Sequence, residues 1–297
     1  MKPNGEYVTA DDGVRLFVQR VGDGPDALIV PNRVYMVDAF ARLANRRAVL
    51  FCDPRNRGVS DRVTELAKVE KGIDHDVDDF EAIRRHYGID RVSLLGHSYM
   101  ATGIALYAMK YPQHTRRVVQ IGPMGPDASR QYPAHLSNAD ATLNDVLARL
   151  SALQKERPSL EPMAFCKKFW AMLRPLYVVE PADADRLGWE PCHLPNETAF
   201  MKPWTEHVLP SLQRLHLTPD DFARVRSPVL VIHGRKDRSS AYGGGRDWAL
   251  QLPEARLLTV DNAAHVPWIE APDLVFDAID TFLNGGWPET SERVTTL

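Results

Sequence analysis

The stretch that decides the fold is residues 91–109, with the sequence RVSLLGHSYMATGIALYAM. Its first part, residues 92–95, is mostly apolar and has the length of a buried strand, and residues 102–109 have the composition of a helix. Ser98 lies at the junction between the two. A serine in a sharp strand-to-helix turn projects its hydroxyl out of the backbone, next to the free N–H groups at the helix start. Taken alone Ser98 is also an ordinary helix N-cap, so its partners decide between the two interpretations.

Four motifs resemble those of the α/β-hydrolase superfamily. Residues 96–100, GHSYM, resemble its G-x-S-x-G nucleophile motif, with Met100 in place of the last glycine. The segment 53–61, DPRNRGVSD, resembles its D-x-R-G-x-G-x-S loop, with Asn56 in place of one glycine. The segments GRKD at 234–237 and NAAHVPWIEAP at 262–272 resemble its acid and histidine loops. The resemblance implies an enzyme with a serine nucleophile.

The order of expected elements predicts an α/β fold with a mainly parallel central sheet and helices on both faces. A hairpin is expected around the Asp-Gly turn at 11–13. Further strands are expected at 26–31, 48–53, 117–121, 227–233 and 255–260, and helices at 37–45, 74–87, 247–252 and 273–283. Between two blocks of this pattern, residues 127–222 are rich in prolines and helical patterns. We therefore expect a core built from residues 1–126 and 223–297, with 127–222 inserted as a helical cap.

Candidate partners of Ser98 follow two of the apolar strands. Asp237 comes shortly after the strand at 227–233, and His265 comes shortly after the strand at 255–260. Functional side chains gather at the carboxyl ends of parallel strands, so these two are expected beside Ser98. The order Ser98, Asp237, His265 is that of the α/β-hydrolases. Asp261 is a weaker alternative for the acid, because it lies in the same loop as His265.

The remaining histidines near these motifs are expected to be structural. His97 adjoins the nucleophile and should pack or form hydrogen bonds, and His233 ends a buried strand and should be a core residue.

An oxyanion hole requires two N–H donors. The first is expected from Tyr99, directly after the serine. The second is expected from the loop at 31–36, PNRVYM, where the superfamily usually has His-Gly and this chain has neither residue. Aligning Asn32-Arg33 with His-Gly favours the N–H of Val34, with that of Arg33 as the alternative.

The expected pocket is apolar, and a group of residues near the mouth of the sheet and in the cap is expected to bind substrate: Arg33, Tyr35, Met124, Trp170, Trp204 and Trp268. Among them, Arg33 is a candidate to bind a substrate carboxylate if it points inward, and it is otherwise a surface charge. Some of the aromatic residues are expected only to join the cap to the core.

Composition excludes several classes of function. The net charge of −3 is too small to indicate nucleic acid as a partner, and no apolar run has the length of a membrane span. Cys52, Cys166 and Cys192 are widely spaced, which suggests neither a disulfide framework nor a zinc site. We therefore expect a cytoplasmic protein with a small-molecule substrate, without a cofactor or a metal, and either monomeric or a homodimer.

These observations predict a serine hydrolase that cleaves a small or medium, partly apolar ester or amide through an acyl-enzyme. Within the superfamily the chain looks most like proline iminopeptidase-type and small-ester hydrolases. An iminopeptidase holds the substrate amine with cap carboxylates, for which Glu190, Glu197 and Glu206 are available. Two alternatives of other classes are a catalytically silent fold that binds a small ligand and a lyase on the same core.

Overall fold

A seven-stranded sheet forms the centre of the molecule, with the order β1–β2–β4–β5–β6–β7 and β3 paired with β2. The computed structural model describes residues 4–189 and 191–297. β1 is antiparallel to β2, whereas the pairs β2–β4, β4–β5, β5–β6 and β6–β7 are parallel. The strands are β1 (Glu6–Thr9), β2 (Arg15–Pro31), β3 (Arg47–Cys52), β4 (Val92–His97), β5 (Thr115–Ile121), β6 (Val229–Gly234) and β7 (Ala255–Val260). The predicted α/β class is confirmed.

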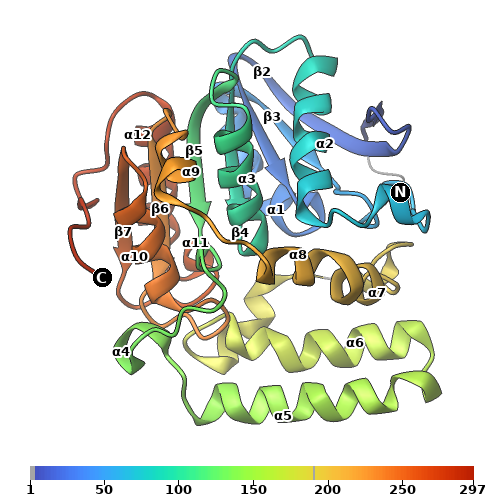
Figure 1. Cartoon of the computed structure of the whole chain (residues 1–297). Helices are drawn as coiled ribbons and strands as arrows, with labels where there is room; N and C mark the ends of the chain where they lie inside the picture. The colour runs from blue at the N-terminus through green and yellow to red at the C-terminus, as the bar shows by residue number, and fades with distance from the viewer. Residues whose placement is uncertain (1–3, 190) are drawn as a thin grey trace.

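Helices cover both faces of this sheet (Figure 1). On one face lie α2 (Ile73–His86), α3 (Tyr99–Lys110) and α10 (Tyr242–Gln251), and on the other lie α1 (Arg33–Phe40) and α12 (Pro272–Leu283). Successive residues of a strand enter the two cores in turn: Leu94 packs on the first side and Leu95 on the second. A strand buried on both faces is apolar throughout, which is why the sequence showed unbroken apolar runs rather than alternation.

The start of the sheet differs from the expectation. The sequence suggested a hairpin strand and a separate strand at 26–31, but the structure joins them in one strand, β2. β3 pairs with both halves, with Val21 opposite Val49 and Ala27 opposite Ala48, so the register shifts between Val21 and Asp26 do not end the strand. The polar and glycine-rich residues that suggested a break mark this irregularity instead.

The helix expected at 37–45 begins earlier in the structure. α1 starts directly after Asn32, which has a left-handed backbone with φ 60° and ψ 47°. The second half of the expected helix is a separate 3₁₀ turn, Ala41–Asn45. The early start brings the first turn of α1 to the carboxyl end of β2.

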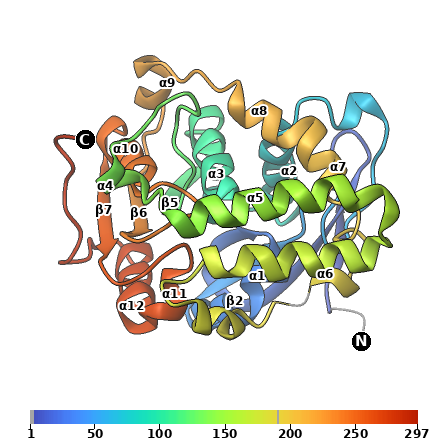
Figure 2. The same cartoon turned by 90° about the horizontal axis from the view of Figure 1, so that it is seen from below.

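The described chain between β5 and β6 consists of helices joined by loops, without a strand of its own. Its two longest helices, α5 (Ala141–Glu156) and α6 (Pro162–Leu173), lie together on one side of the molecule (Figures 1 and 2). The shorter helices include α4 (Ala134–Ser137), α7 (Met201–Pro203), a π-helical turn (Trp204–Val208), α8 (Leu209–Gln213) and α9 (Pro219–Ala223). Over the described ranges, none of the helices has the length and apolar character needed to cross a membrane.

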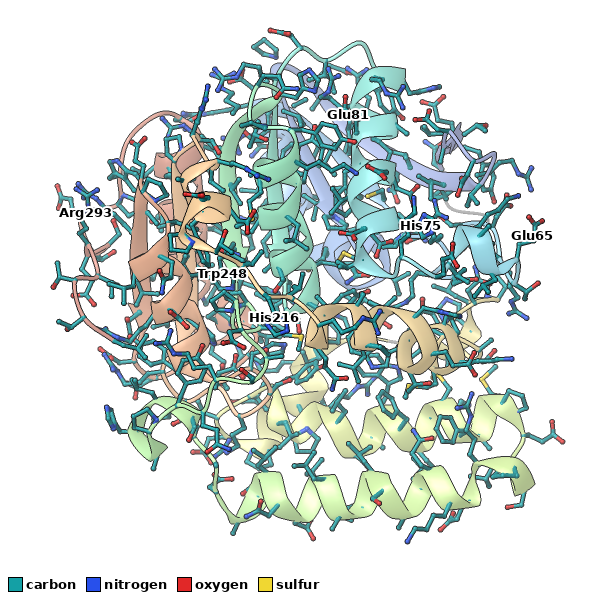
Figure 3. All side chains as sticks on the ribbon, in the orientation of Figure 1. Glu65, His75, Glu81, His216, Trp248 and Arg293 are labelled. Atoms are coloured by element: carbon teal, nitrogen blue, oxygen red, sulfur yellow. A yellow bond between two sulfur atoms is a disulfide. The ribbon has the colours of Figure 1, made fainter. Side chains whose placement is uncertain are left out.

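One tryptophan holds the two ends of this helical segment against the core. Trp248 of α10, labelled in Figure 3, donates from its Nε1 to the carbonyl oxygen of Met124 at 2.7 Å. Its ring lies 5.8 Å from that of Phe222 in α9. Met124 follows β5 and Phe222 precedes β6, so the segment leaves and re-enters the core at neighbouring places.

The cysteines depart from the expectation. Cys166 of α6 and Cys192 form a disulfide, whereas Cys52 is buried and free. The cysteine spacing suggested no disulfide, and this interpretation is wrong, because the fold brings together two cysteines that lie 26 residues apart in the chain. The cysteine spacing consequently gives no support to a reducing, cytoplasmic location.

Candidate active site

Ser98 occupies a strained turn between β4 and α3. Its backbone has φ 58° and ψ −131°, a region that residues other than glycine rarely adopt. The turn is so tight that a Cβ on Gly96 would lie 2.6 Å from the carbonyl oxygen of Met100, which explains the glycine at position 96. Met100, the departure from the motif, has a side chain only 1% exposed that packs into the core beside α2. The strained turn therefore tolerates a methionine at this position.

Asp237 and His265 meet at the carboxyl end of the sheet. The His265 Nδ1 lies 2.8 Å from the Asp237 Oδ2, and both side chains are fully buried. The Asp237 Oδ1 accepts hydrogen bonds from the backbone N–H groups of Ser239 and Ser240, each at 2.8 Å. Burial alone would raise the pKa of Asp237, but the neighbouring His265 and the hydrogen bonds from His233 and His265 hold it well below the usual carboxyl range. Asp237 is therefore an ionised partner for the imidazole.

The alternative acid lies elsewhere. The Asp261 side chain is 72% exposed and accepts a hydrogen bond from the Arg235 Nε at 2.6 Å. The geometry places Asp237, and not Asp261, beside His265.

His265 is held on several sides and keeps one nitrogen free. Its backbone N–H donates to the carbonyl oxygen of Tyr177 at 3.0 Å, and its own carbonyl oxygen accepts from the His97 Nε2 at 2.9 Å. The ring of Tyr177 lies 4.7 Å from the imidazole. Its Nε2 has no hydrogen-bond partner within the described chain, so it is the atom available to take a proton.

A glycine makes room for this pair at the end of β5. Gly122 has φ +52°, and a Cβ there would lie 3.1 Å from the His265 Nδ1 and 3.4 Å from the Asp237 Oδ2. The imidazole and the carboxylate thus pack directly against the backbone that follows β5.

A cavity of about 290 Å³ opens beside Ser98. Four of the residues predicted to bind substrate line it, namely Tyr35, Met124, Trp170 and Trp204. Most of its wall is aromatic, and its remaining lining residues are Asn32, Met36, Arg57, His97, Ser98, Tyr99, Phe169, Leu173, Tyr177, Trp189, Phe200, Ser239 and Ser240. Core and helical segment both contribute, so an acyl or alkyl group bound here would touch both.

Two predicted pocket residues lie away from the cavity. Trp268 is 2% exposed and packs its ring 4.7 Å from that of His97, behind the cavity wall. The Arg33 Nη2 lies 3.0 Å from the Asp53 Oδ2, in a buried ion pair. Asp53, directly after β3, is buried and therefore needs a cationic partner. Arg33 fills that role, so it is not available to bind a substrate carboxylate as the sequence had suggested.

The two expected oxyanion donors come from helix starts near the cavity. Tyr99 is the first residue of α3, and Val34 is the second residue of α1. The next N–H of α1, that of Tyr35, already donates to the Asn32 carbonyl oxygen at 2.9 Å. Asn32 itself lines the cavity, which brings the first turn of α1 close to it. The assignment of Tyr99 and Val34 as donors stays a prediction.

Sequence reasoning missed a buried charged network in the cavity wall. The Arg57 guanidinium contacts both oxygens of Glu197, with its Nε and Nη2 each 3.0 Å away. Glu197 also accepts from the Tyr35 hydroxyl at 2.7 Å and from the Gly58 N–H at 2.8 Å. Burial would raise the pKa of Glu197, but Arg57 outweighs it and the pKa is lowered. No local pattern could have paired Arg57 with a carboxylate 140 residues away.

Of the other two cap carboxylates, Glu206 does not offer an amine site at the cavity. The Glu206 side chain is 51% exposed, with the His207 Nε2 3.9 Å away, and it is absent from the cavity lining. Glu190 lies outside the described residues. Within the part of the chain that the structure describes, no cluster of three or more histidine, cysteine or acidic side chains is arranged to hold a metal ion.

Comparisons with known proteins agree with this architecture. Residues 30–272 match the family described as "alpha/beta hydrolase fold". The AB hydrolase superfamily protein YisY of Bacillus subtilis is 23% identical over 94% of this chain and 99% of its own length. A proline iminopeptidase of Heyndrickxia coagulans is 22% identical over 84% of this chain and 86% of its own. The structure of an esterase from Exiguobacterium antarcticum superposes with a TM-score of 0.70 at 15% identity, covering 95% of this chain and all of that one.

Proposed function

This chain belongs to the α/β-hydrolase family, and we propose that it is a serine hydrolase that cleaves small or medium, partly apolar esters through an acyl-enzyme on Ser98. One observation carries the proposal. The His265 Nδ1 is bound to the Asp237 Oδ2 at 2.8 Å while its Nε2 is free, and Ser98 is held in a strained turn at the same edge of the sheet. A bound Nδ1–H leaves the Nε2 lone pair to act as the base.

In this mechanism the Ser98 Oγ attacks the ester carbonyl carbon and its proton passes to the His265 Nε2. The buried Asp237 carboxylate stabilises the imidazolium that forms. The N–H groups of Tyr99 and Val34 donate to the oxyanion. The imidazolium then protonates the departing alkoxide, and the C–O bond breaks to leave an acyl-Ser98 ester. Water, deprotonated by His265, hydrolyses this ester and restores the serine.

The charge of the cavity wall favours a neutral substrate. Arg57 is the cationic side chain in the lining, and Glu197 already neutralises it. An iminopeptidase-type substrate would need a free carboxylate for its amine, and Glu197 accepts hydrogen bonds from Arg57, Tyr35 and Gly58. The buried pair therefore supports an ester with apolar groups over an aminoacyl amide.

We further propose that residues 127–222 act as a cap that sets specificity while the rest of the chain carries the chemistry. Phe169, Trp170 and Leu173 of α6 line the cavity that also contains Ser98. A cap over the serine excludes water and strengthens the electrostatic interactions of the site.

The test is a panel of p-nitrophenyl esters of increasing acyl length, run beside prolyl- and alanyl-anilides with the wild type and with Ser98→Ala. We expect turnover of the esters by the wild type only, with kcat lowered by several orders of magnitude in the variant. Faster turnover of the prolyl anilide would favour the aminopeptidase. Full activity of Ser98→Ala would contradict the mechanism, and no turnover of any ester by the wild type would favour the silent ligand-binding fold.

A further inference from the structure

We infer that His233 is a positioning residue, which binds the same oxygen of the catalytic carboxylate as His265 and tunes the basicity of the catalytic imidazole. This inference rests on the function proposed above. His233 is fully buried near the end of β6, and its Nε2 lies 3.0 Å from the Asp237 Oδ2. The same oxygen accepts from the His265 Nδ1 at 2.8 Å. One carboxylate oxygen therefore lies between two imidazoles.

The surroundings of His233 determine its tautomer. Its Nε2 faces two acceptors, the Asp237 Oδ2 at 3.0 Å and the Ser240 carbonyl oxygen at 3.1 Å. An unprotonated Nε2 would point a lone pair at both of them, so this nitrogen carries the hydrogen and donates. The Nδ1 is buried without a hydrogen-bond partner in the described chain. A proton there would have no acceptor among the described residues, which favours the tautomer with the hydrogen on Nε2.

The helix packed against β6 is shaped to admit this ring. A Cβ on Gly245 of α10 would lie 2.3 Å from the His233 Nδ1 and 3.0 Å from its Cγ. The imidazole thus lies directly against the backbone of α10, where any other residue would displace it. A glycine inside a helix destabilises that helix relative to alanine. This position therefore trades helix stability for room beside Asp237.

With His233 included, four donors hold the Asp237 carboxylate. Ser239 and Ser240 bind one oxygen, and His233 and His265 share the other. Each donor draws negative charge away from the contact with His265. Removing the donor from His233 leaves a more basic carboxylate, which stabilises the His265 imidazolium more strongly.

Because the effect is one of charge, it also depends on the other titratable groups around the two histidines. His97 packs its ring 4.4 Å from His265, and Tyr177 packs its ring 4.7 Å from it on the cap side. Tyr242 of α10 lies with its ring 5.7 Å from His233. Neither tyrosine hydroxyl has a hydrogen bond to Asp237 among the described contacts. Unlike these neighbouring rings, His233 binds the Asp237 carboxylate directly.

The test compares His233→Gln with His233→Met, two side chains of similar size of which only glutamine can donate a hydrogen bond. We expect kcat/KM for a p-nitrophenyl ester to fall on the order of 10-fold in the methionine variant, because a carboxylate that has lost one of its four donors orients His265 less well, and this loss outweighs the stronger stabilisation of the imidazolium. The pH at which kcat/KM reaches half its plateau should rise in this variant. In the His233→Gln variant, both kcat/KM and the pH of the half-plateau should lie close to the wild-type values. Tyr242→Phe is the matched control. It removes the contact of the Tyr242 hydroxyl with Thr259 beside the same ring, and it should leave the dependence of kcat/KM on pH unchanged.

The imidazole titration of His265, followed by NMR in a Ser98→Ala background, tests the inference without turnover. We expect His265 to titrate at higher pH in the methionine variant than in the parent or the glutamine variant. Equal titration curves in all three would overturn the inference, as would equal losses of activity in Gln and Met with an unmoved pH profile. Absence of ester turnover by the wild type would refute the proposed function instead, and the NMR result would still decide the role of His233.

Discussion

At the scale of single residues, the carboxyl ends of the strands position the side chains of the candidate site. Ser98, Asp237 and His265 each follow an apolar strand of a parallel sheet, and such strands deliver their next residues to one edge. Arg33 and Trp268 follow strands as well, but the side chain of Arg33 turns to Asp53 and that of Trp268 packs behind His97. Side-chain direction just after a strand depends on partners far away in the chain, so it could not be predicted.

Asp237→Asn should lower kcat on the order of 10⁴-fold, because the amide cannot hold His265 in the tautomer that leaves Nε2 free. Asp261→Asn should change kcat little, since its side chain is 72% exposed and contacts only Arg235 among the hydrogen bonds described. Steady-state kinetics on one ester with both variants check this. A larger loss in Asp261→Asn would show that the acid has been misassigned.

At the scale of elements, the strands and long helices were predicted within a few residues, because periodic apolar patterns reflect burial. The irregular parts were not. β2 continues through the glycine-rich residues because β3 pairs with both of its halves. The contacts that fix Glu197, which lies between the short helices of the cap, come from the loop at Arg57 and from Tyr35 in α1. Pairings of this kind are tertiary, so no local pattern shows them.

Helix α2, marked in Figure 3 by His75 and Glu81, contains a carboxyl group that favours its protonated form. Asp76 is 4% exposed, and burial, with the neighbouring Asp79, raises its pKa to about 8. Its carboxyl is ionised in the unfolded chain above about pH 4 but stays protonated in the folded one. The contribution of Asp76 to the free energy of unfolding should therefore decrease as pH rises from about 4 to about 8.

Asp76→Asn should remove this penalty and stabilise the protein by at least about 1 kcal/mol at pH 7.5, with a much smaller effect at pH 4. Urea unfolding at several pH values measures the difference between variant and wild type. Asp273→Asn, on the exposed start of α12, is the control. A difference between Asp76→Asn and wild type that does not change with pH would contradict the expectation.

The cap helices should set the preferred chain length. Trp170 of α6 and Trp204 both line the cavity with Ser98, so Trp170→Ala and Trp204→Ala should shift the optimal acyl length more than they change turnover of the acetate ester. Truncating a buried tryptophan typically costs about 3–5 kcal/mol of stability, so thermal unfolding must be followed in parallel. If both variants remain folded with an unaltered chain-length profile, the tryptophans are cap structure only.

At the scale of the whole molecule, the fold class followed from the alternation of strands and helices on both sides of residues 127–222. The disulfide did not, since nothing in the spacing of three cysteines shows which two meet. The disulfide joins α6 to the chain at Cys192. Phe169 of α6 and Trp189, three residues before Cys192, both line the cavity. The bond therefore constrains the same segment that we propose sets specificity.

The protein purified without reductant should show one free thiol per chain in denaturant, that of Cys52, and three after reduction. Replacing Cys166 and Cys192 by serine should lower the free energy of unfolding by up to about 3 kcal/mol, because the closed loop of 26 residues restricts the unfolded chain. Thiol titration and urea unfolding measure the two effects. Three thiols before reduction would contradict the disulfide.

The central claim is that Ser98, activated by His265, is the nucleophile. The most direct measurement is reaction with a fluorophosphonate followed by mass spectrometry of the intact chain and of its peptides, on the wild type, Ser98→Ala and His265→Gln. We predict one adduct per chain, on the peptide that contains Ser98, formed quickly in the wild type, very slowly in His265→Gln and not at all in Ser98→Ala. An adduct on another residue, or a wild type that hydrolyses esters while Ser98 stays unlabelled, would contradict the account.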